Sequence, residues 1–467
     1  MSITTSKNTA AVENAVPSFA EATRVWAKIG MLSFGGPAGQ IALMHKELVE
    51  DRGWISEQRF LHALNYCMLL PGPEAQQLAT YIGWLMHRTK GGLIAGMLFV
   101  LPGALVMLGL SILYVFYRHT PFIDAAFFGV KAAVLAVVVE AVLRIGKRAL
   151  KNRIMVSMAF AAFIGIYVFH IPFPIIIILA GMSGWIGNQI APKLFTGEGH
   201  AGKRTVAGFD GIIDRMFDRG ELTHTEPSMK NTIYTLLVWL PVWLSPVLFL
   251  WLISEGSSIW AQIGTFFSGM AIVTFGGAYA VLSYVAQAAV DTFSWLTAGE
   301  MVDGLGLAET TPGPLIMVLQ FVGFLAAYRT PGLLDPLLAG CLGALLTTWV
   351  TFAPSFLFIF VGAPYSEALR GNKIASAILT AITAAVVGVI LNLALWFALH
   401  VIFREVRSLD LWGVRPDVPI LSSIDWTAAA FTLATMIAMF RFKAGMLMTL
   451  AVSAIAGLAL RAVEGSF

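Results

Sequence analysis

Long apolar runs occupy most of the chain and are separated by short polar stretches. A helix needs roughly 20 mostly apolar residues to cross a bilayer. Thirteen segments approach that requirement. The apolar residues within them are continuous rather than alternating, which favours helices and argues against a β-barrel. The pattern predicts an all-α polytopic membrane protein with spans near 18–40, 60–84, 92–116, 121–143, 154–169, 172–191, 232–253, 259–289, 302–327, 331–361, 374–402, 427–440 and 443–461.

Composition excludes most classes of soluble protein. The chain has 467 residues, of which 58% are hydrophobic and 12% charged, whereas a globular protein carries roughly 25% charged residues. The net charge of +3 gives no basis for a nucleic-acid partner. The eight histidines and two cysteines lack the spacing of a metal site, so we expect no metal and no cofactor. The first 20 residues are polar and show no signal peptide, so the lipid bilayer is the expected environment and the spans themselves direct insertion.

The positions of lysine and arginine predict the orientation. The loop 144–153 holds five basic residues and no acid, which is typical of a cytoplasmic loop. The long stretch 192–231 then also lies inside, with an amphipathic helix expected near 209–219. Thirteen crossings place the N-terminus in the cytoplasm and the C-terminus outside. One loop opposes this assignment, because Arg404, Arg407 and Arg415 fall where the pattern predicts the outer side.

The chain contains an internal repeat. An FGG motif at Phe34, a tryptophan at Trp54 and a PGP motif at Pro71 recur in the same order 241 residues later. Pro102 recurs as Pro354, at a spacing of 252. An ordered series at nearly constant spacing indicates a duplication.

The segment 232–253 has no counterpart in the repeat. An even number of spans followed by one extra crossing turns the second copy upside down, so the sequence predicts two inverted-topology repeats with glycine- and proline-broken helices. The expected divisions are a cytoplasmic tail 1–17, a first repeat 18–191, a cytoplasmic linker 192–231, a connecting transmembrane helix 232–253 and a second repeat 254–467.

The repeated glycine–proline motifs are the candidate binding site. Glycine allows close backbone approach and proline breaks a helix, so four breaks would direct helix N-termini into the protein. Such termini attract anions through unpaired N–H groups and a partial positive charge. The alternative is that these residues only permit tight packing and kinks. The predicted substrate-binding residues in the motifs are Phe34, Gly35, Gly36, Pro37, Pro71, Gly72, Pro73, Phe275, Gly276, Gly277, Pro312, Gly313 and Pro314.

Three ionisable residues of the first half add chemistry to this site. Lys131 lies in the middle of an apolar segment and could attract an anion, or form an internal ion pair. Glu74 follows PGP and Glu140 lies nine residues after Lys131 on the opposite helix face; both are candidates for proton coupling, although Glu74 could be a simple helix cap. Their repeat counterparts are uncharged: Leu315, Thr383 and Asn392. We therefore expect the ionisable residues to be confined to the first half.

The motifs resemble those of the chromate transporter (CHR) family in its long, two-domain form. The resemblance rests on Ser33 to Pro37, Leu69 to Gln77, Leu101 to Gly103, Gly129 to Val139 and the second-half FGG and PGP motifs. It implies export of chromate, with sulfate as a similar anion, across a bacterial inner membrane, driven by the membrane potential or a proton gradient. A homodimer is one assembly left open. The chain departs from the family pattern at Ala132, Ala278 and Tyr279.

Two other functions compete with this interpretation. Uptake of sulfate or another oxyanion is the alternative within the transporter class. An enzyme acting on lipid phosphates would need an acidic, metal-binding loop, for which Asp210, Asp214 and Asp218 are the nearest candidates; the interspersed Arg215 and Arg219 indicate ordinary helix ion pairs instead.

Overall fold

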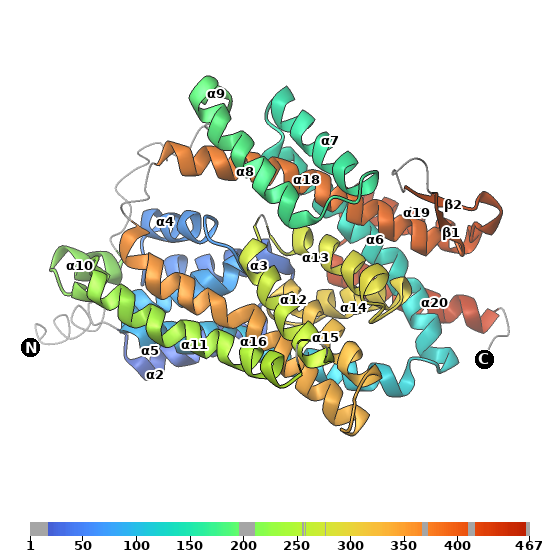
Figure 1. The fold of residues 1–467 in the computed structure, drawn as a ribbon, viewed down its shortest axis with the longest axis horizontal. Coiled ribbons are helices and arrows are strands. Elements are labelled where there is room, and N and C mark those ends of the chain that lie inside the picture. The colour runs from blue at the N-terminus through green and yellow to red at the C-terminus, as the bar shows by residue number, and fades with distance from the viewer. Residues whose placement is uncertain are drawn as a thin grey trace, which may run out of the picture.

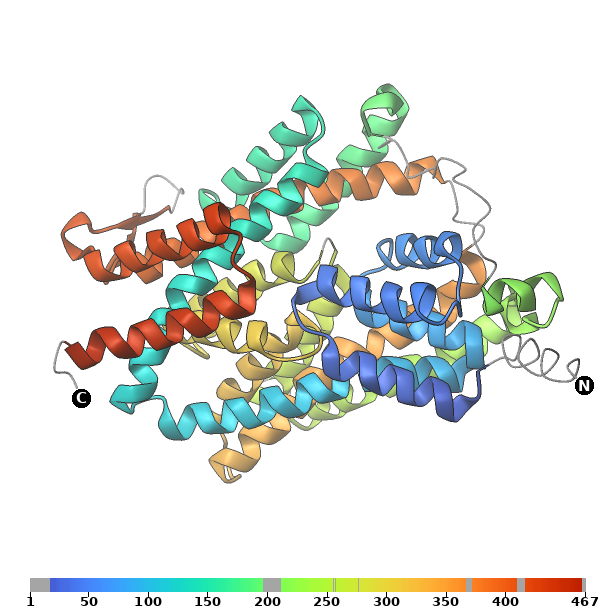
Figure 2. The same ribbon diagram turned by 180° about the vertical axis from the view of Figure 1, so that it is seen from behind.

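The computed structural model is an elongated bundle of helices (Figure 1). It describes residues 17–195, 211–254, 256, 258–275, 277–366, 372–409 and 416–463. The predicted tail 1–17, apart from Pro17, and the candidate site residue Gly276 lie outside this part. The start of α2 and the end of α20 lie at opposite ends of the long axis (Figures 1 and 2).

The first half consists of helices joined by short connections. In chain order they are α2 (Phe19–Leu32), α3 (Gly36–His45), the π-helix η1 (Lys46–Glu50), α4 (Glu57–Cys67), α5 (Glu74–Tyr117), α6 (Pro121–Ala149), α7 (Arg153–Tyr167) and α8 (Phe173–Ile190).

The connection to the second half is partly helical. Its elements are α9 (Pro192–Phe195), α10 (Ile212–Asp218), η2 (Thr223–Thr225) and the long helix α11 (Met229–Ser254). The helix expected near 209–219 therefore exists as α10, and its buried Ile212 and Ile213 form the apolar side.

The second half repeats the order of the first and adds a small sheet. Its helices are α12 (Ile259–Val273), α13 (Ala278–Gln287), η3 (Ala288–Thr292), α14 (Ala298–Thr310), η4 (Leu315–Met317), α15 (Val318–Arg329), α16 (Pro336–Gly362), η5 (Ala363–Tyr365), α18 (Lys373–Ile402), η6 (Leu421–Ser423), α19 (Trp426–Phe442) and α20 (Met446–Val463). The purely helical prediction needs one correction, because β1 (Val406–Ser408) and β2 (Asp417–Pro419) pair antiparallel.

Four of the predicted spans are broken helices. The segments 18–40, 60–84, 259–289 and 302–327 are each interrupted at their glycine–proline motif, because proline ends a helix and positive-φ glycines turn the chain. The first PGP break also changes the division between the predicted spans 60–84 and 92–116, because the end of the first span and the whole of the second belong to one helix. α5 begins at Glu74, continues through 92–116 and carries non-helical backbone at His87 and Arg88.

Seven helices among the described residues are long and apolar enough to cross a membrane. These are Glu74–Tyr117, Pro121–Ala149, Phe173–Ile190, Met229–Ser254, Pro336–Tyr365, Lys373–Ile402 and Met446–Val463. Four shorter apolar helices accompany them, at Arg153–Tyr167, Ile259–Val273, Leu315–Arg329 and Trp426–Phe442.

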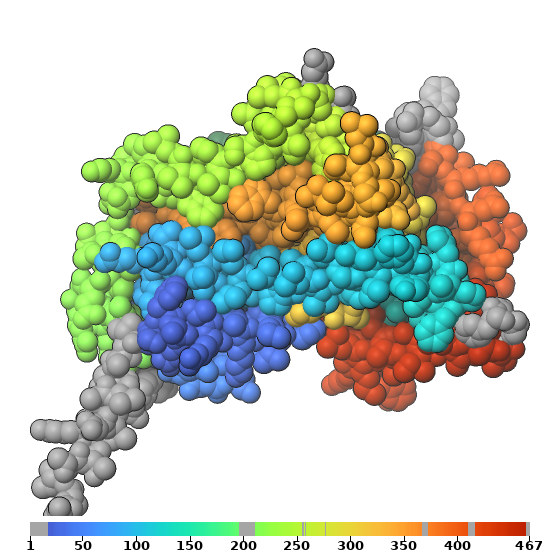
Figure 3. Space-filling model, turned by 90° about the horizontal axis from the view of Figure 1, so that it is seen from below, coloured from blue at the N-terminus to red at the C-terminus, as the bar shows by residue number. Residues whose placement is uncertain are grey.

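The two halves pack through each other rather than side by side. The helices α7 and α8 pack on α18 of the second half, while α19 and α20 pack on α6 of the first. One face of the molecule shows α5 lying between α2 and α16 (Figure 3). The core is thus shared between the halves, and neither half buries its apolar surface alone.

The repeated tryptophans are buried parts of this core. Trp54 is 3% exposed and Trp295 is 4% exposed, so both pack inside the protein rather than on its surface. The backbone N–H of Trp54 donates to the carbonyl of Leu48, and the backbone N–H of Trp295 donates to the carbonyl of Ala289, both at 2.8 Å. The repeat in sequence is therefore also a repeat in local structure.

Candidate functional site

Each glycine–proline break begins a new helix. The breaks precede α3, α5, α13 and the η4–α15 pair, with Gly35, Pro73, Gly277 and Pro314 at the N-cap positions. None of these four residues provides a side-chain hydrogen bond to the helix start. The neighbouring helices α2, α4, α12 and α14 are all capped by a serine or threonine side chain. The first-turn amides therefore lack a side-chain cap only at the breaks among these eight helix starts.

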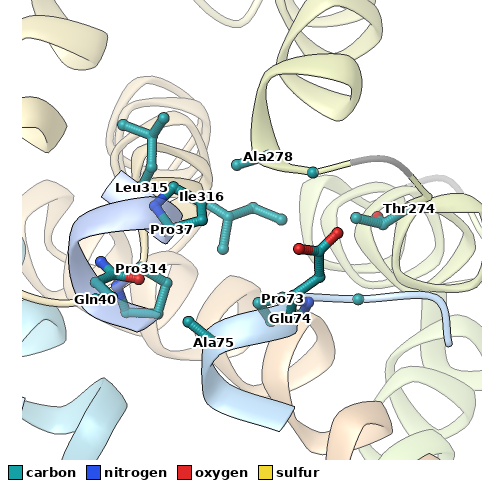
Figure 4. Close-up of a pocket in the computed structure, with 12 residues that line it drawn as sticks. Pro37, Gln40, Pro73, Glu74, Ala75, Thr274, Ala278, Pro314, Leu315 and Ile316 are labelled. Atoms are coloured by element: carbon teal, nitrogen blue, oxygen red, sulfur yellow. The ribbon is translucent and has the colours of Figure 1, made fainter. Parts of the chain in front are cut away.

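All four breaks meet at one pocket (Figure 4). Its lining comes from the start of α3, the start of α5, the α12–α13 break and the start of η4. The residues are Pro37, Gln40, Gly72, Pro73, Glu74, Ala75, Thr274, Gly277, Ala278, Pro314, Leu315 and Ile316. The cavity measures about 20 Å³, which is enough for about one water molecule.

Two reciprocal backbone hydrogen bonds close the pocket. The N–H of Gly72 donates to the carbonyl of Thr274 at 2.8 Å, and the N–H of Gly313 donates to the carbonyl of Ser33 at 2.7 Å. Gly313 is the repeat counterpart of Gly72, and Thr274 that of Ser33. Each PGP motif is thus tied to the FGG break of the other half, which brings together residues about 200 or more positions apart.

Glycine is required at the centre of both PGP motifs. Gly72 has a φ of +120° and Gly313 a φ of +91°, a region that other residues rarely adopt. A Cβ atom at Gly72 would also lie 2.7 Å from the side-chain nitrogen of Gln77. At Gly103 a Cβ atom would lie 2.4 Å from the carbonyl oxygen of Pro312, so α5 approaches the second PGP motif closely as well.

Glu74 is the charged residue of the pocket. It is the first residue of α5, and its carboxylate points into the cavity (Figure 4). No hydrogen bond or ion pair joins that carboxylate to any other residue that the structure describes. The described lining contains no lysine or arginine. The predicted position of Glu74 in the first turn is confirmed.

Glutamines surround the pocket with unused hydrogen-bonding capacity. Gln40 donates to the carbonyl of Gly313 at 2.5 Å, and Gln77 donates to that of Pro71 at 2.6 Å. The side-chain oxygens of both, and both polar atoms of Gln76, are buried without a partner among the described residues. Buried polar groups are normally satisfied, so these atoms indicate a place that receives water or a polar ligand. The prediction of the site from sequence missed all three, although glutamines within apolar helices are a readable signal.

Lys131 is not part of the pocket lining. Its Nζ lies 3.5 Å from Oδ1 of Asp303, a fully buried residue of α14. The other carboxylate oxygen of Asp303 accepts hydrogen bonds from Arg118 at 3.1 Å and from the Tyr114 hydroxyl at 2.9 Å. The internal ion pair, one of the two interpretations of Lys131, is therefore present. Its side chain is still 23% exposed.

Glu140 belongs neither to the pocket lining nor to the ion pair of Lys131. It is 39% exposed and 3.9 Å from Arg144, one turn further along α6. As expected from the helix geometry, Glu140 and Lys131 have different partners.

Two buried acids of the second half did not emerge from the sequence pattern. Asp303 is fully buried, and Glu309 is 3% exposed, with an oxygen 2.6 Å from the donating hydroxyl of Tyr279. The expectation that ionisable residues are confined to the first half is therefore wrong. Both acids are visible within the predicted span 302–327. A search that starts from the acidic residues of the first half and looks for their repeat counterparts misses both acids. The first-half counterpart of Asp303 is His62, and that of Glu309 is Met68.

The acidic residues of the linker have a structural role. Asp214 accepts hydrogen bonds from the backbone N–H of Ser56 at 2.9 Å and from Arg59 at 2.8 Å. Its carboxylate is thus committed to the start of α4. Asp210 lies outside the described residues.

Comparison with known proteins identifies the family. The family model described as Chromate transporter matches residues 20–185 and 261–458. A chromate transport protein of Pseudomonas aeruginosa is 33% identical over 398 residues, which cover 82% of this chain and 83% of the relative. A chromate transport protein of Cupriavidus metallidurans is 27% identical over 364 residues, or 78% of each chain. An uncharacterized transporter of Bacillus subtilis is 30% identical over 180 residues, which make up 38% of this chain and 91% of the relative.

No solved structure matches the chain. The family model nevertheless covers both halves, and the Pseudomonas relative aligns over most of its own length. The chain belongs to the chromate transporter family, whose members are multi-pass membrane proteins that transport rather than catalyse.

Proposed function

We propose that this protein is a secondary transporter that exports chromate across the bacterial inner membrane, with the pocket between the four helix breaks as its anion site. The observation that carries the proposal is the convergence of four helix starts without side-chain caps on one cavity. Two relatives that match most of the chain are named chromate transport proteins.

Backbone amides suit a tetrahedral dianion. Each helix start carries a partial charge of about +0.5 and several unpaired N–H donors. Four such starts can surround the four oxygens of chromate without a bulky side chain. The positive-φ glycines Gly35, Gly36, Gly72, Gly277 and Gly313 let the backbone turn at the breaks. At Gly277, which lines the cavity, an added Cβ would meet open space.

The described conformation is a closed one. A cavity of about 20 Å³ holds about one water molecule, which is less than an anion with four oxygens requires. Binding and release therefore require the breaks to separate. The hydrogen bonds from Gly72 to Thr274 and from Gly313 to Ser33 are the contacts that would open.

The two halves, 18–191 and 254–467, are proposed to be inverted-topology repeats around this pocket. Reciprocal hydrogen bonds between equivalent residues support a pseudo-two-fold relation. The Bacillus relative supports it too, because it is about as long as one half. The helix α11 then makes the extra crossing, with the N-terminus and the linker 192–231 in the cytoplasm.

Charge compensation is proposed to couple the anion to protons. The Glu74 carboxylate points into the same cavity that would hold chromate, so the two negative groups would repel each other. Protonation of Glu74 removes that repulsion, and Glu140, half-exposed on α6, is the proposed point of exchange with water. Lys131 is proposed to attract the dianion on its way to the pocket. During this passage the anion would replace Asp303 as the partner of the Lys131 ammonium group.

Chromate uptake into inverted vesicles tests the proposal. Vesicles that contain the protein should accumulate labelled chromate, and a protonophore should reduce the accumulation. Vesicles with the Gly72→Val variant, inserted in equal amount, should not accumulate it. Equal accumulation with and without the protein would contradict the proposal.

Transport of sulfate or another oxyanion is the second candidate. It is favoured by the predominance of backbone amides in the pocket, because amides distinguish poorly between dianions of the same shape. Competition by unlabelled sulfate separates the candidates. Half-inhibition by sulfate at a lower concentration than by chromate would make sulfate the preferred substrate.

A further inference from the structure

We propose that Glu309, positioned by Tyr279, takes up and releases a proton once in each transport cycle; the inference rests on the proposed anion site. Neither residue belongs to the repeated motifs, and their first-half counterparts, Met68 and Ala38, cannot titrate. The second half would thus contribute a proton site of its own.

The two residues lie directly behind the pocket wall. Tyr279 follows the lining residue Ala278 at the start of α13, and Glu309 precedes the PGP motif that leads to the lining residue Pro314. The hydroxyl of Tyr279 donates to Glu309 at 2.6 Å. Glu309 is 3% exposed and Tyr279 is 6% exposed. The hydrogen bond therefore connects two helix breaks that move when the pocket opens.

Glu309 has no cation in direct contact among the residues that the structure describes. On α6, Arg144 and Glu140 act on it electrostatically with opposite signs. The buried acid of the same helix, Asp303, has two cations, Arg118 at the C-cap of α5 and Lys131 of α6. A buried carboxylate whose contact is a hydroxyl group is costly to charge, so its charge depends on what occupies the pocket.

The balance of charge gives the coupling. A dianion in the pocket makes the potential at Glu309 more negative and favours uptake of one proton from water by the carboxylate. When the anion leaves on the other side, the proton is released there to water. One proton then moves with each dianion on Glu309, whereas Glu74 is protonated before the anion binds and keeps its proton during the cycle. The net charge moved is therefore one negative charge. Because the dianion and its proton together carry one negative charge, an inside-negative membrane potential still drives them out of the cell.

The test uses the full-length protein in proteoliposomes that enclose a pH-sensitive dye. Wild-type protein should move protons together with chromate. Its flux should fall as the pH rises, approaching about tenfold per pH unit at the alkaline end, as for one titrating acid. Glu309→Gln should keep chromate–chromate exchange but lose proton movement and the steep fall of the flux at the alkaline end. Glu226→Gln, the same change at an exposed linker residue, should behave as the wild type.

Each outcome decides the inference. Proton movement and a wild-type pH profile in Glu309→Gln would overturn it while leaving the anion site in place. A wild-type protein that moves no chromate would overturn the proposed function and this inference with it. Where Glu309→Gln does not reach the membrane, Tyr279→Phe carries the test. It keeps the carboxylate but removes the hydrogen bond, and should shift the pH profile; an unchanged profile would contradict the positioning role.

Discussion

At the scale of single residues, backbone geometry rather than side-chain charge distinguishes the pocket. The glycines of the breaks have positive φ values, and the four helix starts that they create lack side-chain caps. Gly277 shows this most clearly, because its φ is +97° and a Cβ atom added there would have no other atom within 4 Å. A side chain at this position would meet empty pocket rather than protein, so its effect on transport can be separated from its effect on packing.

Substitution of the break glycines should abolish export without a matching loss of inserted protein. Gly36→Ala and Gly277→Ala introduce about 1–3 kcal/mol of backbone strain, and Gly277→Ala also places a methyl group in the pocket. Gly72→Ala and Gly313→Ala disturb the hydrogen bonds between the halves. The measurement is chromate export per inserted molecule. Gly109→Ala is the matched control, since it has free space and no positive φ. Export that simply follows the amount of protein would assign the breaks to packing.

Replacement of Lys131 should weaken transport. Lys131→Gln removes the charge that we propose attracts the dianion, whereas Lys131→Arg keeps the charge in a different geometry and should retain part of the activity. Asp303 keeps Arg118 and Tyr114 as partners in either variant, which favours folding. Initial transport rates at low chromate report the effect. A normal rate in Lys131→Gln would restrict Lys131 to a structural ion pair.

At the scale of elements, the linker is attached to the first broken helix pair. The N–H groups of Ile212 and Ile213 donate to the carbonyls of Gly53 and Trp54 at 3.1 and 2.9 Å. Asp214 binds the start of α4, the helix that leads to the first PGP motif. In the second half, the carbonyl of Trp295 accepts instead from Arg329 of α15. The two α-helices before the PGP motifs are therefore held by different partners.

Acid should loosen the linker. Burial lowers the pKa of His224, whose Nε2 lies 3.0 Å from the carbonyl oxygen of Trp84. The docked linker therefore prefers the neutral imidazole, and the released linker binds the proton more readily. The docking energy from this contact is complete above about pH 6.5 and is lost as the pH falls through the lowered pKa. Hydrogen exchange of residues 211–225, corrected for its intrinsic pH dependence, should speed up below about pH 6.5. Exchange that stays constant relative to α14 would contradict this.

At the scale of the whole molecule, the proposed inverted repeat makes a simple prediction about the termini. The start of α2 and the end of α20 lie at opposite ends of the bundle (Figure 2), so an N-terminus inside requires a C-terminus outside. Cysteine labelling of both ends in intact cells, with a membrane-impermeant reagent, checks this. Labelling of both ends, or of neither until the cells are lysed, would contradict the inverted arrangement.

Local patterns in the sequence were sufficient for much of this description. The long apolar runs predicted membrane-spanning helices, and the PGP motifs predicted helix breaks. The spacing of 241 residues, shared by the FGG motifs, the two tryptophans and the PGP motifs, predicted a duplication. The spans and the breaks depend on composition and on interactions within a few residues, and the duplication appears when the sequence is compared with itself. These patterns failed for the buried acids Asp303 and Glu309, since a burial environment depends on the elements that pack against a residue. They also did not reveal the hairpin of β1 and β2.

Only the tertiary structure decided how the parts meet. The convergence of four breaks, the exchange of hydrogen bonds between Gly72 and Thr274, and the partners of Lys131 and Glu309 all join distant parts of the chain. No local pattern encodes such contacts, because they depend on how helices of both halves pack together; α6 against α14 is one such pair. Helix breaks follow from the chemistry of proline and glycine at each position, whereas a pocket exists only once the halves have packed around it.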